Sequence, residues 1–111
     1  MSPTLLYIDF PFQGPWGPQL AAACEGLAAD IASEPGLRWK LWTEAPDNGR
    51  AGGAYLFDRR EDAQRYLDKH VPRLRAFGVM EADVRLCEVN AALSDITGGP
   101  LAASVRGKLP A

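Results

Sequence analysis

The chain has 111 residues, of which 47% are hydrophobic and 23% charged, and its formal net charge is −2. This balance is typical of a globular domain and excludes the disordered and fibrous classes of protein. No apolar run approaches the ~20 residues that cross a bilayer, and the mild negative charge does not attract nucleic acid. We therefore expect a single soluble domain whose partner is neither a membrane nor a nucleic acid.

The first residues, Met-Ser-Pro-Thr-Leu-Leu-Tyr, lack the basic segment and the small-residue cleavage site of a signal peptide, so we expect a cytoplasmic protein. Cys24 and Cys87 lie far apart in the chain, and His70 is its single histidine. These residues match neither a zinc-ligand spacing nor a Cys-x-x-Cys redox motif. They predict two free, buried thiols and no metal site.

The first half of the chain begins with a strand and a helix. Residues 4–10 are short and apolar and precede Pro11 and further Gly and Pro residues, which predicts a strand that ends in a tight turn. From Pro18 onward apolar residues recur every three or four positions, which is typical of a helix with one apolar face. Pro35-Gly36 is expected to end this helix.

A hairpin is predicted next. Residues 37–44 alternate in polarity, residues 45–49 have the composition of a turn, and residues 51–57 form a third strand. The Gly52-Gly53 pair indicates either a bulge or the close approach of a ligand or of neighbouring backbone.

The last two elements are a long helix and a strand. Asp58 and Glu61 have the spacing of a capping box, and the helix that they open is expected to end at Gly78. Pro72 should kink this helix or begin a second short one. Residues 79–90 predict the fourth strand.

The order βαββαβ predicts an α+β, ferredoxin-like fold: one antiparallel four-stranded sheet with both helices on one face. This single domain covers residues 1–97, and residues 98–111 are predicted to be a loosely attached tail. The strands at residues 4–10 and 79–90 carry apolar side chains on both faces. The helix-free face of the sheet therefore needs a cover, and we expect a homodimer.

Several short motifs in the middle of the chain carry a family resemblance. They are Glu34-Pro35-Gly36, Trp39-Lys40, Trp42-Thr43-Glu44, Ala51-Gly52-Gly53 and Tyr55-Leu56-Phe57. In order and spacing they resemble the YdhR-type monooxygenases of the dimeric α/β-barrel (ABM) superfamily. The resemblance extends over residues 4–97.

The resemblance implies a homodimer whose two sheets close a barrel, with a pocket between sheet and helices in each subunit. It also implies a cofactor-independent monooxygenase that acts on a small planar aromatic or polyketide-like compound. Two alternatives remain open: a non-catalytic dimer that binds a small molecule, and an isomerase or cyclase that uses the same pocket without oxygen.

His70 is the candidate catalytic residue. An oxygenase without a cofactor needs a base that converts its substrate into an electron-rich anion, and an imidazole with an ordinary pKa near 6.5 suits this role. The structural alternative is a histidine whose hydrogen bonds are satisfied at the edge of a helix core.

The candidate substrate-binding residues are mainly aromatic. Trp39 and Trp42 are three positions apart on a strand, so only one of them faces the pocket, where it would sit beside Tyr55 on the next strand. Phe12 is expected near the pocket mouth. For each of these residues simple packing is the alternative.

Asp9 and Glu44 are the candidate polar anchors or additional bases, and the alternative for each is a solvated strand end. An RNA-recognition module shares the βαββαβ order, and Leu6-Tyr7-Ile8 is similar to its first-strand motif. The third strand, however, has Gly52 and Ala54 where stacking aromatic residues belong. We therefore do not expect RNA as a partner.

Overall fold

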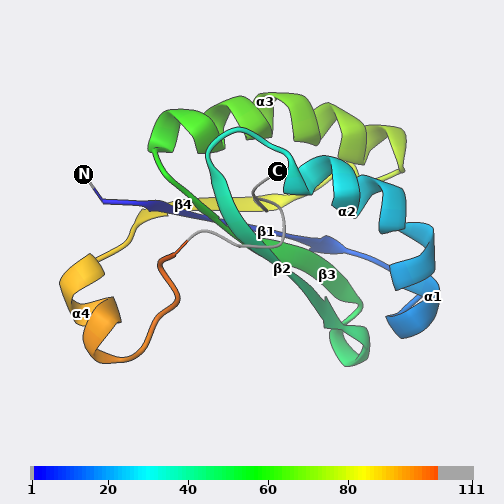
Figure 1. Cartoon of the computed structure of the whole chain (residues 1–111). Coiled ribbons are helices and arrows are strands. Elements are labelled where there is room, and N and C mark those ends of the chain that lie inside the picture. The colour runs from blue at the N-terminus through cyan, green and yellow to red at the C-terminus, as the bar shows by residue number, and fades with distance from the viewer. Residues whose placement is uncertain (1, 103–111) are drawn as a thin grey trace.

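The structure, a computed structural model, describes residues 2–102, which form one antiparallel sheet with the helices between residues 17 and 76 on one face and a short last helix apart from them (Figure 1). In chain order its elements are β1 (Thr4–Pro11), α1 (Gly17–Ala23), α2 (Glu25–Ala32), β2 (Leu37–Ala45), the 3-10 helix η1 (Pro46–Asn48), β3 (Arg50–Phe57), α3 (Arg60–Ala76), β4 (Asp83–Glu88) and α4 (Ala91–Ile96). The strand order is β2-β3-β1-β4, and each neighbouring pair is antiparallel. This arrangement confirms the predicted ferredoxin-like α+β fold.

The first helical region is divided in two, which the sequence did not predict. The backbone of Cys24, at φ −104° and ψ 9°, departs from helical geometry between α1 and α2. Hydrogen bonds from Cys24 N to Leu20 O and from Ala28 N to Cys24 O still connect the two helices. The apolar side chains of both helices therefore face the sheet over one continuous surface.

The start of α3 differs from the prediction. Its N-cap is Arg59, which makes no side-chain cap bond, so the predicted capping box is wrong. The Asp58 carboxylate instead accepts a hydrogen bond of 2.6 Å from Arg38 Nε on β2. Pro72 lies inside α3 and begins no second helix; it is exposed, so its missing N–H faces the solvent side.

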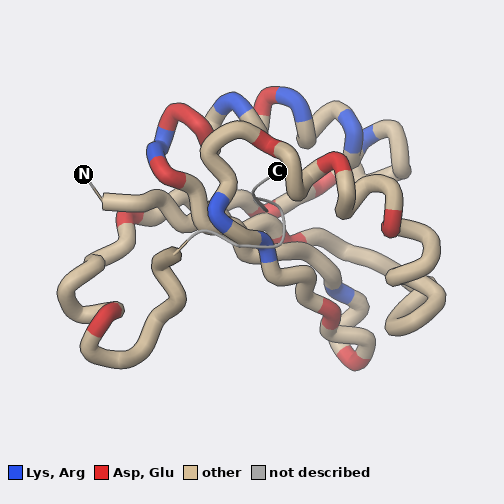
Figure 2. The backbone as a smooth tube through the Cα atoms, viewed as in Figure 1, with Lys and Arg blue, Asp and Glu red and all other residues tan. Residues whose placement is uncertain are grey.

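Charged residues of both signs alternate along α3 (Figure 2). The Asp62 carboxylate binds the guanidinium groups of Arg59 and Arg65, and Arg73 binds Asp30 of α2. Since these charges pair with one another, the helix surface offers no patch of a single sign to a polyanion. No helix within residues 2–102 has the length and apolar composition needed to cross a membrane.

The end of the described chain contains an unpredicted helix. β4 is shorter than the predicted strand at residues 79–90, and the helix α4 follows it. At the start of α4 the Asn90 side chain accepts a hydrogen bond of 3.1 Å from Leu93 N. The chain then returns to β2, where Trp39 Nε1 donates to Pro100 O (2.8 Å) and Arg38 Nη1 donates to Leu101 O (2.7 Å). The rest of the predicted tail, residues 103–111, lies outside the described residues.

The pairing of β2 with β3 contains a register irregularity, and it lies in β2. The register shifts between Leu37 and Trp39, so the predicted bulge at Gly52-Gly53 is absent. The other interpretation of this glycine pair is confirmed, because a β-carbon on Gly52 would lie 1.9 Å from the carbonyl oxygen of Ile8 on β1. Only glycine allows β3 and β1 to approach this closely.

The core fills the space between one half of the sheet and α3. Its largest fully buried side chains are Tyr55, Tyr66, Phe57, Leu6, Ile8 and Ile31. Tyr66 Oη donates to Tyr55 Oη at 3.0 Å, and the rings of Tyr55, Tyr66 and Phe57 lie in mutual contact. Two buried hydroxyls are thus satisfied inside an aromatic cluster, as burial requires.

The sheet face opposite α3 carries exposed apolar side chains. Tyr7 of β1 is 38% exposed and Leu41 of β2 is 59% exposed. Cys87 of β4 is also exposed, so its predicted burial is wrong, whereas Cys24 is half-buried under the helices.

Candidate active site

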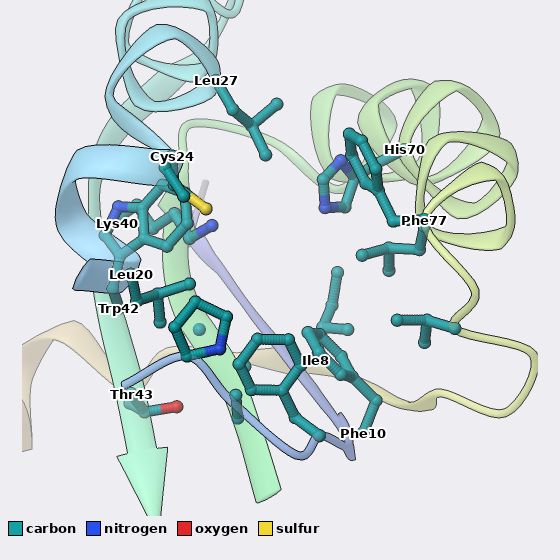
Figure 3. Close-up of a pocket in the computed structure, with 18 of the residues that line it drawn as sticks. Ile8, Phe10, Leu20, Cys24, Leu27, Lys40, Trp42, Thr43, His70 and Phe77 are labelled. Carbon is teal, nitrogen blue, oxygen red and sulfur yellow. The ribbon is translucent and has the colours of Figure 1, made fainter. Parts of the chain in front are cut away.

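A cavity of about 330 Å³ lies between the sheet and the helices, in the half that the core leaves open (Figure 3). Its wall is mainly apolar and is formed in large part by Ile8, Phe10, Leu20, Leu27, Trp42 and Phe77. The volume is at the lower end of the ~300–1,000 Å³ range of small-molecule sites.

The sequence of β3 explains why this half is hollow. Tyr55 and Phe57 fill the core at one end of the strand, but Ala51, Gly52 and Gly53 line the cavity at the other end. These residues place almost no side-chain volume under α1 and α2. The glycine pair that brings two strands together also leaves room for a ligand.

Lys40 is the charged group of the cavity. It lies on β2 directly opposite Tyr55, and its Nζ is 3.4 Å from the ring centroid of Trp42 and 4.6 Å from that of Tyr55. Burial among these rings lowers the pKa of Lys40 to about 7, an effect that Arg73 increases and that Cys24 opposes. At neutral pH the amine is therefore balanced between its charged and neutral forms.

His70 projects from α3 to the cavity and is 3% exposed. Its Nδ1 accepts from the Arg73 guanidinium, whose Nη2 lies 3.0 Å away. Burial, together with the charges of Lys40 and Arg73, lowers the pKa of His70 to about 3. The ring is thus neutral at pH 7, and since Nδ1 is an acceptor, the ring proton resides on Nε2.

Tyr55 lines the cavity at its boundary with the core, and its hydroxyl is bonded to Tyr66 Oη. Burial raises the pKa of Tyr55 to about 12, so the phenol stays protonated at neutral pH. The lining therefore combines the Lys40 amine, the neutral His70 imidazole and the side chains of Cys24, Thr43 and Tyr55 with a mainly apolar wall. Such an arrangement can hold a flat molecule that presents one polar or anionic oxygen.

The cavity mouth is closed on one side by an aromatic loop. Phe12 packs edge-to-face against both Phe10 and Trp16, and Phe12 N donates to Gly49 O at 2.8 Å. The Glu44 carboxylate accepts a hydrogen bond of 2.7 Å from Gly17 N at the start of α1.

The structure brings together four of the residues predicted for the site: His70, Trp42, Tyr55 and Phe12 all line the cavity. Of the two tryptophans it is Trp42 that faces the cavity. Trp39 lies on the opposite side of β2.

The remaining predicted anchors lie elsewhere. The Asp9 carboxylate binds the guanidinium of Arg50 at 2.7 Å, on the helix-free face of the sheet. Glu44 lines a smaller neighbouring cavity, which shares Trp42 with the main one.

Sequence reasoning missed Lys40. The alternation of β2 placed it on the same face as Trp42, and that was the signal that could have identified it. A lysine on an amphipathic strand is ordinarily taken as solvent-exposed, because charged residues are seldom buried without a partner.

The fold and its cavity define a small α+β, ferredoxin-like domain with a mainly apolar cavity between sheet and helices. The model of the family described as "Putative mono-oxygenase ydhR" matches residues 5–100, so the chain belongs to the ydhR family. No curated protein matches the chain.

Two solved structures share the fold. A protein of unknown function from Nitrosomonas europaea, NE2512, superposes with a TM-score of 0.60 at 16% identity, covering 81% of this chain and 91% of its own. The N63A mutant of SnoaB, a cofactor-independent oxygenase from Streptomyces nogalater, has a TM-score of 0.58 at 14% identity, covering 81% of this chain and 95% of its own. At these identities the likeness concerns the fold alone.

Proposed function

We propose that this protein is a cofactor-independent monooxygenase that oxidises a small planar aromatic or polyketide-like compound inside the cavity. The observation that carries the proposal is the 330 Å³ mainly apolar cavity, which has aromatic side chains in its wall and Lys40 and His70 among its lining residues. Membership of the ydhR family supports the reaction type, and the fold shared with SnoaB is consistent with it.

The proposed reaction converts an activated CH₂ group of the substrate into a carbonyl. One oxygen atom of O₂ enters the product and the other leaves as water, while the substrate supplies all four electrons. The protein has to bind the substrate, promote loss of its acidic proton and exclude bulk water. Trp42 and Phe10 would hold the flat rings.

His70 takes part in this proposal as a hydrogen-bond donor. A general base works best when its pKa is close to the working pH, and the pKa of about 3 makes the imidazole a weak base. Its neutral ring, with the proton on Nε2, is suited to donate a hydrogen bond to an oxygen of the substrate.

The proposal is tested by oxygen consumption with a panel of anthrones and related phenols that carry an activated CH₂ group. Protein-dependent uptake is expected, and Trp42→Ala should abolish most of it. Trp39→Ala is the matched control, because it removes the same side chain from the same strand outside the cavity. Saturable binding without uptake would instead indicate a binding protein, and product formation without oxygen an isomerase or cyclase.

The functional unit in this proposal is a homodimer that covers the helix-free sheet face. The support is the apolar surface of that face, where Tyr7 and Leu41 are exposed. A stable interface buries surface of this kind. We expect sedimentation to show that the wild type is a dimer and that the Leu41→Glu variant is a monomer. The control Met80→Glu, at an exposed apolar position off the sheet, should remain a dimer. A wild-type monomer at micromolar concentration would contradict the dimer.

A further inference from the structure

Lys40 presents a cation to an apolar cavity, and nothing in residues 2–102 neutralises it. No hydrogen bond or ion pair joins its Nζ to another side chain in that part of the chain. The nearest interactions are with the faces of the Trp42 and Tyr55 rings. Cation–π contacts of this kind stabilise an ammonium group only in part.

Within residues 2–102, no carboxylate lines the cavity around Lys40. Glu44, on the same strand, accepts from Gly17 N. Asp30 of α2 binds Arg73, and Glu34, which follows α2, binds Lys69 with 2.5 Å between the charged atoms. These three carboxylates thus have other partners, and the Lys40 amine is left available.

Among the described residues, the other titratable groups that line the cavity are Cys24, Tyr55 and His70, and none of them is a carboxylate. Cys24 lies at the junction of α1 and α2, and Tyr55 faces Lys40 from β3. From α3 come His70 and, behind it, the cationic Arg73. The cavity floor is therefore electropositive whenever Lys40 is protonated, and a bound anion would meet no repelling carboxylate there.

We infer that the cavity binds its ligand as an oxyanion, a phenolate or an enolate, whose counter-ion is the Lys40 ammonium. This inference rests on the proposed function, because it names the form in which the substrate would be held. The ligand O–H, or the C–H beside its carbonyl, loses a proton, and the neutral Lys40 amine takes it up, so that an ammonium and an oxyanion form together. No electron moves in this step.

A second donor faces the same site. Arg73 already occupies Nδ1 of His70. The N–H group at Nε2 is therefore left to donate to a ligand oxygen between α3 and β2 (Figure 3). Charge-assisted hydrogen bonds of an ammonium and an N–H to one oxyanion are stronger than those between neutral groups. The Lys40 ion pair converts a phenol or enol into its electron-rich form, the form that reacts with oxygen.

The test uses 4-nitrophenol and its uncharged analogue 4-nitroanisole as probes, because the phenolate of the first has its own visible absorption band. Adding wild-type protein below the pKa of the free phenol should produce this band in a saturable manner. The phenolate should bind at least tenfold more tightly than 4-nitroanisole.

Lys40→Met should abolish the phenolate band and leave 4-nitroanisole binding unchanged or tighter. Lys40→Arg, which keeps a cation, should retain part of the preference for the phenolate. Arg75→Met is the matched control: it removes one positive charge from an exposed position on α3, and it should bind both probes like the wild type. Circular dichroism of each variant establishes that it is folded.

The inference would be overturned if the wild type bound 4-nitroanisole as tightly as the phenolate, if it bound neither probe, or if Lys40→Met kept the phenolate band. Oxygen uptake separates this result from that of the proposed function. Phenolate binding without oxygen uptake by any substrate upholds the inference and contradicts the oxygenase. Oxygen uptake that survives Lys40→Met upholds the oxygenase and contradicts the inference.

Discussion

The space between the sheet and its helices is filled in one half and hollow in the other. In the filled half Phe57, Tyr66 and Leu6 are completely buried. In the hollow half β3 contributes Ala51 and Gly53, and the remaining volume is the cavity. The two ends of a single strand therefore serve different purposes, one holding the fold together and the other accommodating a ligand.

The largest expected effect compares one aromatic residue from each half. Tyr66→Ala should lower the free energy of unfolding by about 3–5 kcal/mol, because it empties a fully packed site. Trp42→Ala should cost only about 1–2 kcal/mol, since Trp42 is 41% exposed and borders empty volume. Urea denaturation measures both. Equal losses would show that the hollow half is as important for stability as the filled half.

The next prediction concerns the glycines of the hollow half. Gly52→Ala should destabilise the protein by about 2–3 kcal/mol, because the new β-carbon would meet the Ile8 carbonyl and the backbone would have to move. Gly53→Ala meets the flexible Lys40 side chain at 2.6 Å, so it should affect stability less and phenolate binding more. Gly26→Ala, with nothing within 4 Å, is the control and should be neutral or slightly stabilising. Similar losses for Gly52→Ala and Gly26→Ala would contradict this account.

The stability of the folded protein should depend on pH through His70, which lies at the boundary of the two halves. Its pKa is about 3 in the folded protein and near 6.5 in the unfolded chain, so the unfolded state binds the extra proton between these values. Stability should thus fall as the pH decreases below 6.5, by about 2 kcal/mol on reaching pH 5.

His70→Gln should flatten this pH dependence. The lowered pKa values of Asp30 and Asp62 act only at still lower pH, and the lowered pKa of Lys40, about 7, acts mainly above pH 7, so His70 dominates the range from 5 to 6.5. An unchanged slope in the variant would mean that His70 is protonated in the folded state.

The smallest expected effect lies inside the filled half. Tyr66→Phe removes the hydrogen bond to the Tyr55 hydroxyl but keeps the ring packing, so it should cost about 1 kcal/mol. Thermal denaturation can detect this difference. A loss as large as that of Tyr66→Ala would mean that the hydroxyl pair, and not the aromatic packing, holds this half together.

Much of the fold could be predicted because its signals are local. The period-two alternation of residues 37–44 and the turn composition of residues 45–49 defined the hairpin, and the alternation also placed Lys40 and Trp42 on one face. Three features depended on tertiary contacts: the register shift after Leu37, the break at Cys24, and the end of β4 before α4. A pattern within one segment carries little information about such contacts.

The site was predictable only in part for the same reason. Aromatic residues on facing strands indicated a pocket, and Trp42 and Tyr55 do line one. The roles of Lys40 and His70 depend on how deeply each is buried and on which neighbours neutralise or oppose its charge. His70 becomes neutral because it is buried between α3 and the sheet beside the charges of Lys40 and Arg73, and Lys40 keeps its amine free because no carboxylate of residues 2–102 lines the cavity.

The hydrogen bonds that tie Pro100 and Leu101 to β2 have a consequence for self-association. β2 is an edge strand, and an open edge is a template on which strands of other molecules can add. Arg38 and Trp39 hold the returning chain against this strand, next to the register shift that makes the edge irregular. We therefore expect the segment after α4 to limit association along this edge, so that a chain ending at residue 97 aggregates at lower concentrations than the full chain.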